Sequence, residues 1–280
     1  MYQLKIPIMS CCLLLGLIAY EVAADEVVSL NTRADVTQSF LLMEPEEEVR
    51  GVVVMFPGHE GVVKFTRIAD GEYDVDSEQG GLTANPTARN TLRGKGFVVV
   101  VLAPPSDQSH GMDTDFRISK AHAEDVRQVI EYLNERYKQK PYLQGHCRSS
   151  YSPPAIINQS GNEKISGMIL SSTRSRGKHG SVLDLTKGAV KVPVLLVHHT
   201  DDPCPGTPYA NLGKLTKFYS QGAPNVDVIS VSGGHISKQG VSRCSGGAHG
   251  FKGVEREVSE AIAGWLLHEN FPEKIEKASW

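Results

Sequence analysis

The sequence predicts an α/β fold, with a mostly parallel central sheet and helices on both of its faces. Short runs of Val, Ile and Leu recur along the chain, and longer amphipathic stretches separate them. Apolar strands that alternate with helices form parallel sheets, and both faces of such a sheet are covered. The chain has 280 residues, 40% of them hydrophobic, which suffices for a single core of this kind.

Six strands are predicted where an apolar run ends at a turn signal. They are residues 51–56, 96–104, 141–145, 166–171, 192–198 and 226–231. Helices are predicted over 119–136 and 254–267, because each segment has apolar residues on one face and charged residues between them. We expect a long connection between 58 and 95, and its acidic run, which lacks calcium-loop spacing, is expected to be a solvated loop.

Residues 1–24 have the three-part organisation of a secretory signal peptide. Lys5 precedes an apolar run from 6 to 19, and small residues at 23 and 24 precede the acidic Asp25. The run is shorter than the roughly 18–20 residues of a membrane-spanning helix. We therefore expect cleavage near Ala24, a mature domain of residues 25–280 without membrane contact, and a periplasmic or secreted location.

Composition limits the kind of partner. Charged residues make up 22% of the chain, and the formal net charge is -3. A nucleic-acid-binding protein needs a basic surface, which this balance of charge does not predict. A small-molecule partner is expected, and the sequence does not predict an oligomeric state.

The segment 145–149, Gly-His-Cys-Arg-Ser, lies between a predicted strand and a predicted helix. A nucleophile on such a sharp turn needs small residues two positions away on either side, because strand and helix approach closely there. Gly145 and Ser149 meet this requirement around Cys147, and amide groups at a helix start favour a thiolate. A buried structural cysteine is the alternative. Ser149 and Ser150 are weaker candidates, because neither has a glycine two residues before it.

This turn resembles the nucleophile turn of the α/β-hydrolase superfamily, whose pattern is small-x-nucleophile-x-small. Dienelactone hydrolases are members with cysteine in Gly-x-Cys-x-Gly. Ser149 departs from their last glycine, and the other local sequences expected of them are absent. The resemblance therefore implies the α/β-hydrolase fold and a catalytic triad, but not the dienelactone substrate.

Chain order in this superfamily is nucleophile, then acid, then histidine. The resemblance implies that Asp202, in the loop after the strand at 192–198, is the acid, with Asp201 as the alternative. It implies that His249, just before the last helix, is the base, with His235 as the alternative directly after the last strand. The acid orients the imidazole, and the imidazole activates the nucleophile.

Three cysteines remain once the signal peptide is removed, and an oxidising compartment allows one disulfide and one free thiol. A bond between Cys204 and Cys244 would tie the acid loop to the histidine loop. It would also leave Cys147 free, in agreement with the proposed turn. The pairing is not determined by the sequence alone.

An oxyanion hole needs two backbone N–H groups. The resemblance implies that Arg148 supplies one and that His59, in the loop after the strand at 51–56, supplies the other; a plain glycine turn is the alternative for this loop. Arg117 and Arg148 are also candidates to bind an anionic substrate group, although a surface salt bridge is the expected role of Arg117.

These residues lead to one hypothesis: hydrolysis of an ester, thioester or lactone through a Cys147–His249–Asp202 triad and an acyl-enzyme. No metal and no organic cofactor are expected. An acyltransferase would use the same site. The alternatives from other classes are a catalytically inactive binding protein and a thiol-redox protein, although the chain lacks a Cys-x-x-Cys motif.

Overall fold

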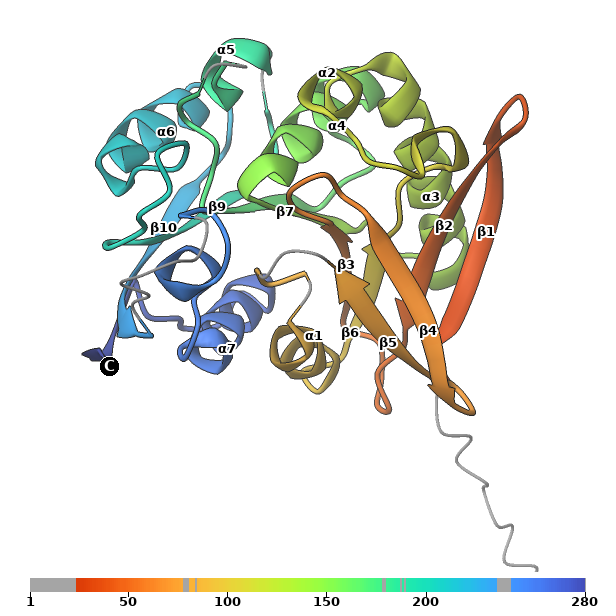
Figure 1. The fold of residues 1–280 in the computed structure, drawn as a ribbon, viewed down its shortest axis with the longest axis horizontal. Coiled ribbons are helices and arrows are strands. Elements are labelled where there is room, and N and C mark those ends of the chain that lie inside the picture. The colour runs from red at the N-terminus through yellow and green to blue at the C-terminus, as the bar shows by residue number, and fades with distance from the viewer. Residues whose placement is uncertain are drawn as a thin grey trace, which may run out of the picture.

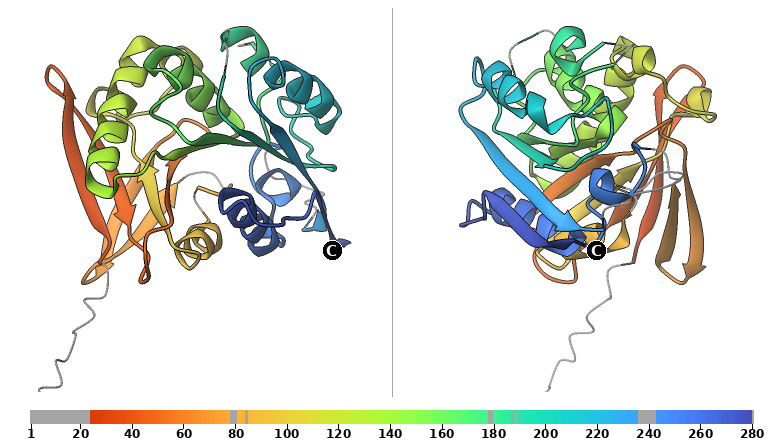
Figure 2. Two further views of the ribbon diagram at one scale, coloured as in Figure 1. Left: turned by 180° about the vertical axis from the view of Figure 1, so that it is seen from behind. Right: turned by 60° about the vertical axis from the view of Figure 1, so that its left-hand side comes forward.

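The computed structural model describes residues 24–279 apart from 78–80, 84, 178–179, 187, 189 and 236–242. A nine-stranded sheet runs through the molecule, and helices pack on both of its faces (Figures 1 and 2). The predicted signal peptide lies outside the described residues, except for residue 24. None of the helices in the described ranges has the length and apolar character that a membrane span requires.

The strands of the sheet follow the order β1-β2-β6-β3-β7-β8-β9-β10-β11, and β4 and β5 form a separate hairpin. All neighbouring pairs from β6 to β11 are parallel, whereas β2 is antiparallel to both β1 and β6. The strands are β1 Glu26–Arg33, β2 Val36–Met43, β3 Gly51–Phe56, β4 Val63–Ala69, β5 Glu72–Ser77, β6 Phe97–Leu102, β7 Tyr142–His146, β8 Gly167–Ser171, β9 Val194–His199, β10 Val226–Gly234 and β11 Lys274–Ser279. The predicted mostly parallel sheet is confirmed.

Helices connect most of the parallel strands, and short 3-10 turns lie at several strand ends. The helices are α1 Pro86–Arg93, α2 Thr114–Arg117, α3 Lys120–Tyr137, α4 Ser152–Ser160, α5 Val182–Leu185, α6 Leu212–Tyr219 and α7 Glu255–Leu266. The 3-10 turns are Ser106–Gln108, Cys147–Tyr151, Tyr209–Asn211 and Gly247–Gly250. The six strands expected from the sequence are β3 and β6 to β10, and the two expected helices are α3 and α7.

Two apolar cores lie on opposite faces of the sheet. Helices α3, α4 and α6 pack on one face against side chains such as Val54 and Leu170. Helices α1 and α7 pack on the other face against side chains such as Val53 and Ile169. Every residue of β3 and β6 is buried, because these central strands are covered on both sides. The continuous apolar runs that predicted these strands follow from this burial.

The connection between β3 and β6 differs from the solvated loop expected over 58–95. It contains the antiparallel hairpin β4–β5 and the helix α1. Most residues of β4 are exposed, and Lys64 lies opposite Asp76 in the hairpin, so its polar composition resembles that of a loop. Helix α1 begins after Asn85, whose Oδ1 accepts a hydrogen bond from the backbone N–H of Thr87 at 2.8 Å. Local capping and cross-strand pairing therefore order most of this connection.

The 3-10 turn after β7 folds back closely on the strand. The Ser149 hydroxyl accepts a hydrogen bond from the backbone N–H of His146 at 2.9 Å. The same hydroxyl lies 3.0 Å from the carbonyl oxygen of Phe56, at the end of β3, and donates to it. A Cβ atom on Gly145 would lie 2.6 Å from the carbonyl oxygen of Ser149. The requirement for a small residue at 145 is therefore a packing requirement against the backbone.

Replacement of this glycine tests the close approach. We expect Gly145→Ala to lower the free energy of unfolding by about 1–3 kcal/mol, because backbone atoms of the turn must move to accept the methyl group. Gly213→Ala in α6 is the matched control, since nothing lies within 4 Å of a Cβ placed there. That change is expected to be neutral or stabilising by up to about 1 kcal/mol. Urea unfolding measures both variants, and equal stability of the two would contradict the packing argument.

Candidate active site

Cys147 lies directly after β7, at the carboxyl edge of the sheet, as the first residue of the 3-10 turn that precedes α4. Its φ angle is 53°, in the left-handed region that side chains other than glycine adopt at a cost. Its thiol is not part of a disulfide. The residue is buried, with 7% of its surface exposed to solvent. A strained backbone and a free thiol are the features expected of a nucleophile on a sharp turn.

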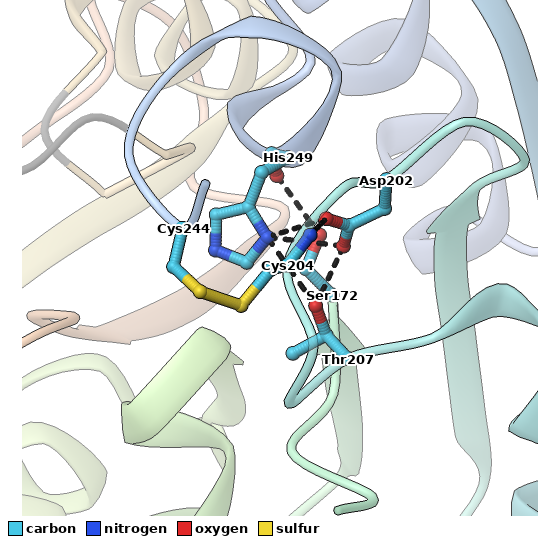
Figure 3. Close-up of a disulfide and its surroundings, with 6 residues drawn as sticks. All are labelled: Ser172, Asp202, Cys204, Thr207, Cys244 and His249. Atoms are coloured by element: carbon cyan, nitrogen blue, oxygen red, sulfur yellow. Dashed lines mark hydrogen bonds and ion pairs between the residues drawn. A yellow bond between two sulfur atoms is a disulfide. The ribbon is translucent and has the colours of Figure 1, made fainter. Parts of the chain in front are cut away.

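His249 and Asp202 approach this turn from the end of the chain. The Nδ1 atom of His249 lies 3.0 Å from both carboxylate oxygens of Asp202 (Figure 3). A ring nitrogen of His249 lies within 4.8 Å of the Sγ atom of Cys147. Because Nδ1 is bound to Asp202, Nε2 is available to the thiol, and it has no hydrogen-bond partner among the described residues. The structure thus brings together the three residues that the sequence suggested as a triad.

Two hydroxyl groups that the sequence did not indicate hold the acid and the histidine. Thr207 donates a hydrogen bond from Oγ1 to Oδ2 of Asp202 at 2.7 Å. Ser172, directly after β8, donates to the backbone carbonyl oxygen of His249 at 2.9 Å (Figure 3). The backbone N–H of Cys204 donates to Oδ1 of Asp202 at 2.9 Å. The carboxylate is therefore fixed from three directions, including the imidazole.

The structure also distinguishes the alternatives that the sequence left open. Asp201 is exposed and accepts a hydrogen bond from the hydroxyl of its neighbour Thr200. His235 follows β10, as expected, and its backbone N–H binds the carbonyl oxygen of Lys252 at 2.8 Å. The carboxylate of Asp202 binds His249 instead. The structure therefore pairs Asp202 with His249, and it places a ring nitrogen of His249 within 4.8 Å of the Cys147 sulfur.

The disulfide expected between Cys204 and Cys244 is present, and it joins the acid loop to the histidine loop (Figure 3). Cys147 is thereby the free cysteine of the described residues. Cys147, Cys204 and His249 bring two sulfur atoms and a ring nitrogen within 4.8 Å of one another, a spacing that metal ligands also have. Since the sulfur of Cys204 is oxidised in a disulfide, it cannot act as a thiolate ligand, and this group does not form a three-ligand metal site.

Charges around Cys147 favour its thiolate form. Burial raises the pKa of the Cys147 thiol, but neighbouring His249, the charge of Arg174 and the backbone N–H of Arg148 outweigh burial and lower the pKa below its usual value. Burial lowers the pKa of His249, whereas Asp202 and Cys147 raise it to about 9. Burial also raises the pKa of Asp202, and its contacts with His249 reverse this effect. At neutral pH the arrangement therefore favours a thiolate beside an imidazolium.

The loop after β3 lies against the turn that carries Cys147. A Cβ atom on Gly58 would lie 3.4 Å from the carbonyl oxygen of His146. Glu60 accepts a hydrogen bond from the Nη1 atom of Arg148 at 2.6 Å. His59 has a φ angle of 48°, so the loop turns sharply at this residue. Both segments expected to supply oxyanion N–H groups, at His59 and Arg148, are thus held next to each other.

Arg117 corrects an expectation from the sequence, because it is fully buried and therefore does not lie on the surface where a salt bridge was expected. Its Nη2 atom donates to the carbonyl oxygen of His59 at 3.1 Å. Its Nε and Nη1 atoms have no hydrogen-bond partner among the described residues. Burial lowers the pKa of Arg117 to about 10, so the guanidinium remains charged at neutral pH. Arg117 therefore holds the loop at His59 in place through its backbone carbonyl group, and it keeps a positive charge close to Cys147.

Three other buried histidines, on strands β7 and β9, have hydrogen-bond partners other than Asp202. The His198 ring binds the hydroxyl of Thr173 at 3.0 Å, and the His199 ring binds the carbonyl oxygen of Gly233 at 2.9 Å. His146 packs its ring against that of His249, with 5.0 Å between the centroids. Burial lowers the pKa of His146 to about 3 and that of His198 to about 4, so both are neutral at neutral pH. His146 therefore presents an uncharged surface to the His249 ring.

One well-formed cavity lies away from these residues. Its volume is about 730 Å³, and it lies between the β4–β5 hairpin and α1. Carboxylates such as Glu46 and Asp74 line it together with Arg89 and Arg93. None of its lining residues belongs to the group around Cys147, so the candidate active site rests on the reactive side chains rather than on the size of a cavity.

Comparisons with known proteins support the fold. No protein-family model matches the sequence, and no curated protein matches it. Among solved structures, the chain is similar to an α/β serine hydrolase homologue from Coxiella burnetii, with a TM-score of 0.57 and 14% identity. That match covers 87% of this chain and 96% of the other. The chain is also similar to an esterase from Pyrococcus furiosus, with a TM-score of 0.57 and 12% identity, over 88% of this chain and 92% of that one.

A third similar structure is an α/β serine hydrolase without lid from Xanthomonas campestris, with a TM-score of 0.53 and 13% identity. The match covers 88% of this chain and 93% of that chain. These likenesses confirm the predicted α/β-hydrolase fold. The proteins from Coxiella burnetii and Xanthomonas campestris are described as serine hydrolases, whereas the sharp turn of this chain carries a cysteine.

The charge arrangement predicts how Cys147 reacts. We expect iodoacetamide to alkylate Cys147 with a midpoint below the pH of about 8.5 that is usual for thiols. In His249→Gln the midpoint is expected to return to that value or above it, because burial then acts on the thiol without the imidazolium. His235→Gln is the matched control and is expected to leave the midpoint unchanged. Mass spectrometry of the alkylated protein against pH measures all three, and identical midpoints would remove His249 from contact with the thiol.

The same shifts predict the pH dependence of stability. The raised pKa of His249 contributes stability that is complete below its unfolded value, about 6.5, and is lost as the pH rises through about 9. The lowered pKa of Cys147 contributes stability that is present above the usual thiol value and is lost as the pH falls through the folded value. Thermal unfolding across this range is expected to show both losses in the wild type. A profile unchanged by His249→Gln would contradict the coupling.

Proposed function

We propose that this protein hydrolyses an ester, thioester or lactone bond of a small acyl substrate, with Cys147 as nucleophile. The observation that carries the proposal is the free thiol of Cys147 beside His249, whose other nitrogen binds Asp202. Nucleophile, base and orienting acid in this relation form the general arrangement of acyl-transfer enzymes. The esterase from Pyrococcus furiosus, which shares the fold, adds support for an ester substrate.

The first half-reaction forms an acyl-enzyme. The Cys147 thiolate attacks the carbonyl carbon, and the electron pair of the C=O bond moves to oxygen. The N–H groups of Arg148 and His59 are proposed to bind this oxyanion, and the charge of Arg117 beneath the loop stabilises it further. The intermediate then collapses, the bond to the leaving group breaks, and His249 gives its proton to the departing atom.

The second half-reaction returns the enzyme to its starting state. His249, now neutral, takes a proton from a water molecule, and the resulting hydroxide attacks the thioester carbonyl. The second tetrahedral intermediate collapses, releases the acid product and restores the Cys147 thiolate beside the protonated imidazole. Asp202 remains ionised throughout and keeps Nδ1 protonated, with Thr207 holding the carboxylate in place.

We also propose that the mature protein begins near Asp25 and acts in the periplasm or outside the cell. The N-terminal sequence has the layout of a signal peptide. The disulfide between Cys204 and Cys244 fits an oxidising compartment, where such bonds persist. Mass spectrometry of the protein purified from its native cells would test the cleavage position, and an intact N-terminus there would overturn this part of the proposal.

Cys147→Ala is expected to abolish hydrolysis of p-nitrophenyl acetate, with a loss of about a thousandfold or more in kcat/KM. Circular dichroism and Tm are expected to show a folded protein, because only one sulfur atom is removed. An acyl group on Cys147, trapped by acid quench and found by mass spectrometry, is expected in the wild type. Retained turnover in the folded variant would remove Cys147 from the mechanism. Formation of an ester product on addition of an alcohol would indicate an acyltransferase instead.

Thr207→Val is expected to lower kcat by about tenfold, because a hydrogen bond to a charged group contributes about 1.5–3 kcal/mol and about 1.4 kcal/mol corresponds to tenfold in rate. The pH profile is expected to shift as well, since Asp202 then holds the imidazolium less firmly. Thr200→Val is the matched control, because its hydroxyl contacts the exposed Asp201. If both variants match the wild type, the hydroxyl at 207 has no positioning role.

A further inference from the structure

The free thiol of Cys147 lies next to a disulfide. Its Sγ atom is within 4.8 Å of the Sγ atom of Cys204, which is bonded to Cys244. A ring nitrogen of His249 lies within the same distance of both sulfur atoms. Figure 3 shows the ring of His249 beside this disulfide, with one nitrogen directed towards Asp202. The proposed hydrolysis uses the imidazole and the thiol, but it gives no role to the short distance between the two sulfur atoms.

Thiolates attack disulfides, and the rate depends on the thiolate fraction, on which sulfur is attacked and on access. The contacts of Cys147 with His249 and the charge of Arg174 favour the thiolate, as described above. The Cys204 residue is 1% exposed, so its sulfur lies inside the protein beside the thiol. Cys244 is only partly buried, so of the two bonded residues it is the more accessible one and the better placed to leave.

We infer that Cys147 undergoes a second reaction, in which its thiolate attacks the Sγ atom of Cys204. A bond forms between Cys147 and Cys204, and the bond between Cys204 and Cys244 breaks. The electron pair of the broken bond leaves on the sulfur of Cys244, which takes a proton from solvent. The number of disulfides stays the same, so the step needs neither an oxidant nor a reductant.

The exchanged form has no nucleophile at the turn after β7 and no covalent link between the acid loop and the histidine loop. In this form a disulfide joins Cys147 to Cys204, and Cys244 carries a free thiol at a partly exposed position. The reverse attack, by Cys244 on Cys204, restores the original bond and the free thiol. This reaction goes beyond the proposed function, because it needs a thiolate at Cys147 but no acyl substrate.

Peptide mapping of the wild type tests the inference. The mature, non-reduced protein is incubated at several pH values, quenched in acid, denatured and labelled with N-ethylmaleimide, then digested with pepsin without reductant. We expect a Cys147–Cys204 peptide together with label on Cys244, and we expect a matching loss of the Cys204–Cys244 peptide. The rate at which both signals appear is expected to fall on acidification, because the thiolate of Cys147, which is the attacking species, is then protonated. Absence of label on Cys244 at every pH would overturn the inference.

Two variants complete the test. Cys147→Ser keeps the Cys204–Cys244 bond and cannot exchange, so any label on its Cys244 would show reduction rather than exchange and would overturn the inference. Cys244→Ser is expected to lose both remaining thiols on treatment with oxidised glutathione, which is reduced as the Cys147–Cys204 bond forms. If Cys147 and Cys204 of this variant both still react with N-ethylmaleimide after the treatment, their sulfur atoms do not come close enough to bond. That result would overturn the inference. Exchange without hydrolysis of p-nitrophenyl acetate would refute the proposed function and leave this inference standing.

Discussion

The site depends on how tightly the turn after β7 folds onto the end of its own strand. β7 lies between β3 and β8 in the sheet, so the turn meets backbone on both sides. The hydroxyl of Ser149 bridges the N–H of His146 and the carbonyl oxygen of Phe56, and Gly145 leaves room for the turn. These contacts hold Cys147 in a left-handed conformation that it would not adopt in a flexible loop. The small residues around the cysteine therefore determine where its sulfur atom lies.

Around this fixed sulfur, the structure arranges alternating charges in a nearly closed space. The side chain of Asp202 is inaccessible, that of His249 is 1% exposed, and Cys147 itself is 7% exposed. An isolated charge in such a place is costly, but each group here has an opposite charge or hydrogen-bond donors beside it. Thr207 and the N–H of Cys204 satisfy the carboxylate, and the imidazolium then stabilises the thiolate. Removal of one member would leave the others as unpaired buried charges, so the three groups act as a unit.

The sequence predicted what depends on local pattern and chain order, and it missed what depends on tertiary contacts. The strands of the parallel core were predictable because burial on both faces requires continuous apolar runs. Cys147, Asp202 and His249 were predicted as a group because the α/β-hydrolase superfamily, which the sequence resembles, has its triad in this chain order. They can make contact because the loops that follow parallel strands meet at the carboxyl edge of the sheet. The hydroxyls of Ser172 and Thr207 carry no local signal, because their role depends on the paths of distant loops. The burial of Arg117 was missed because a charged residue in a polar segment normally faces water.

The position of the disulfide links stability to chemistry. Closing the loop of 40 residues between Cys204 and Cys244 stabilises the fold by about 4 kcal/mol in the chain-entropy description. A bond between Cys147 and Cys204 would close a loop of about 57 residues, whose contribution in the same description differs by only about 0.3 kcal/mol. Loop entropy therefore hardly favours either isomer. The equilibrium between the two disulfide isomers depends instead on the imidazolium of His249. It stabilises the thiolate of Cys147 in the native isomer, whereas a thiolate at the partly exposed Cys244 of the exchanged isomer does not receive this stabilisation. The contact that makes Cys147 a good nucleophile is thus also the contact that keeps the native disulfide in place, and deprotonation or removal of His249 acts on both at once.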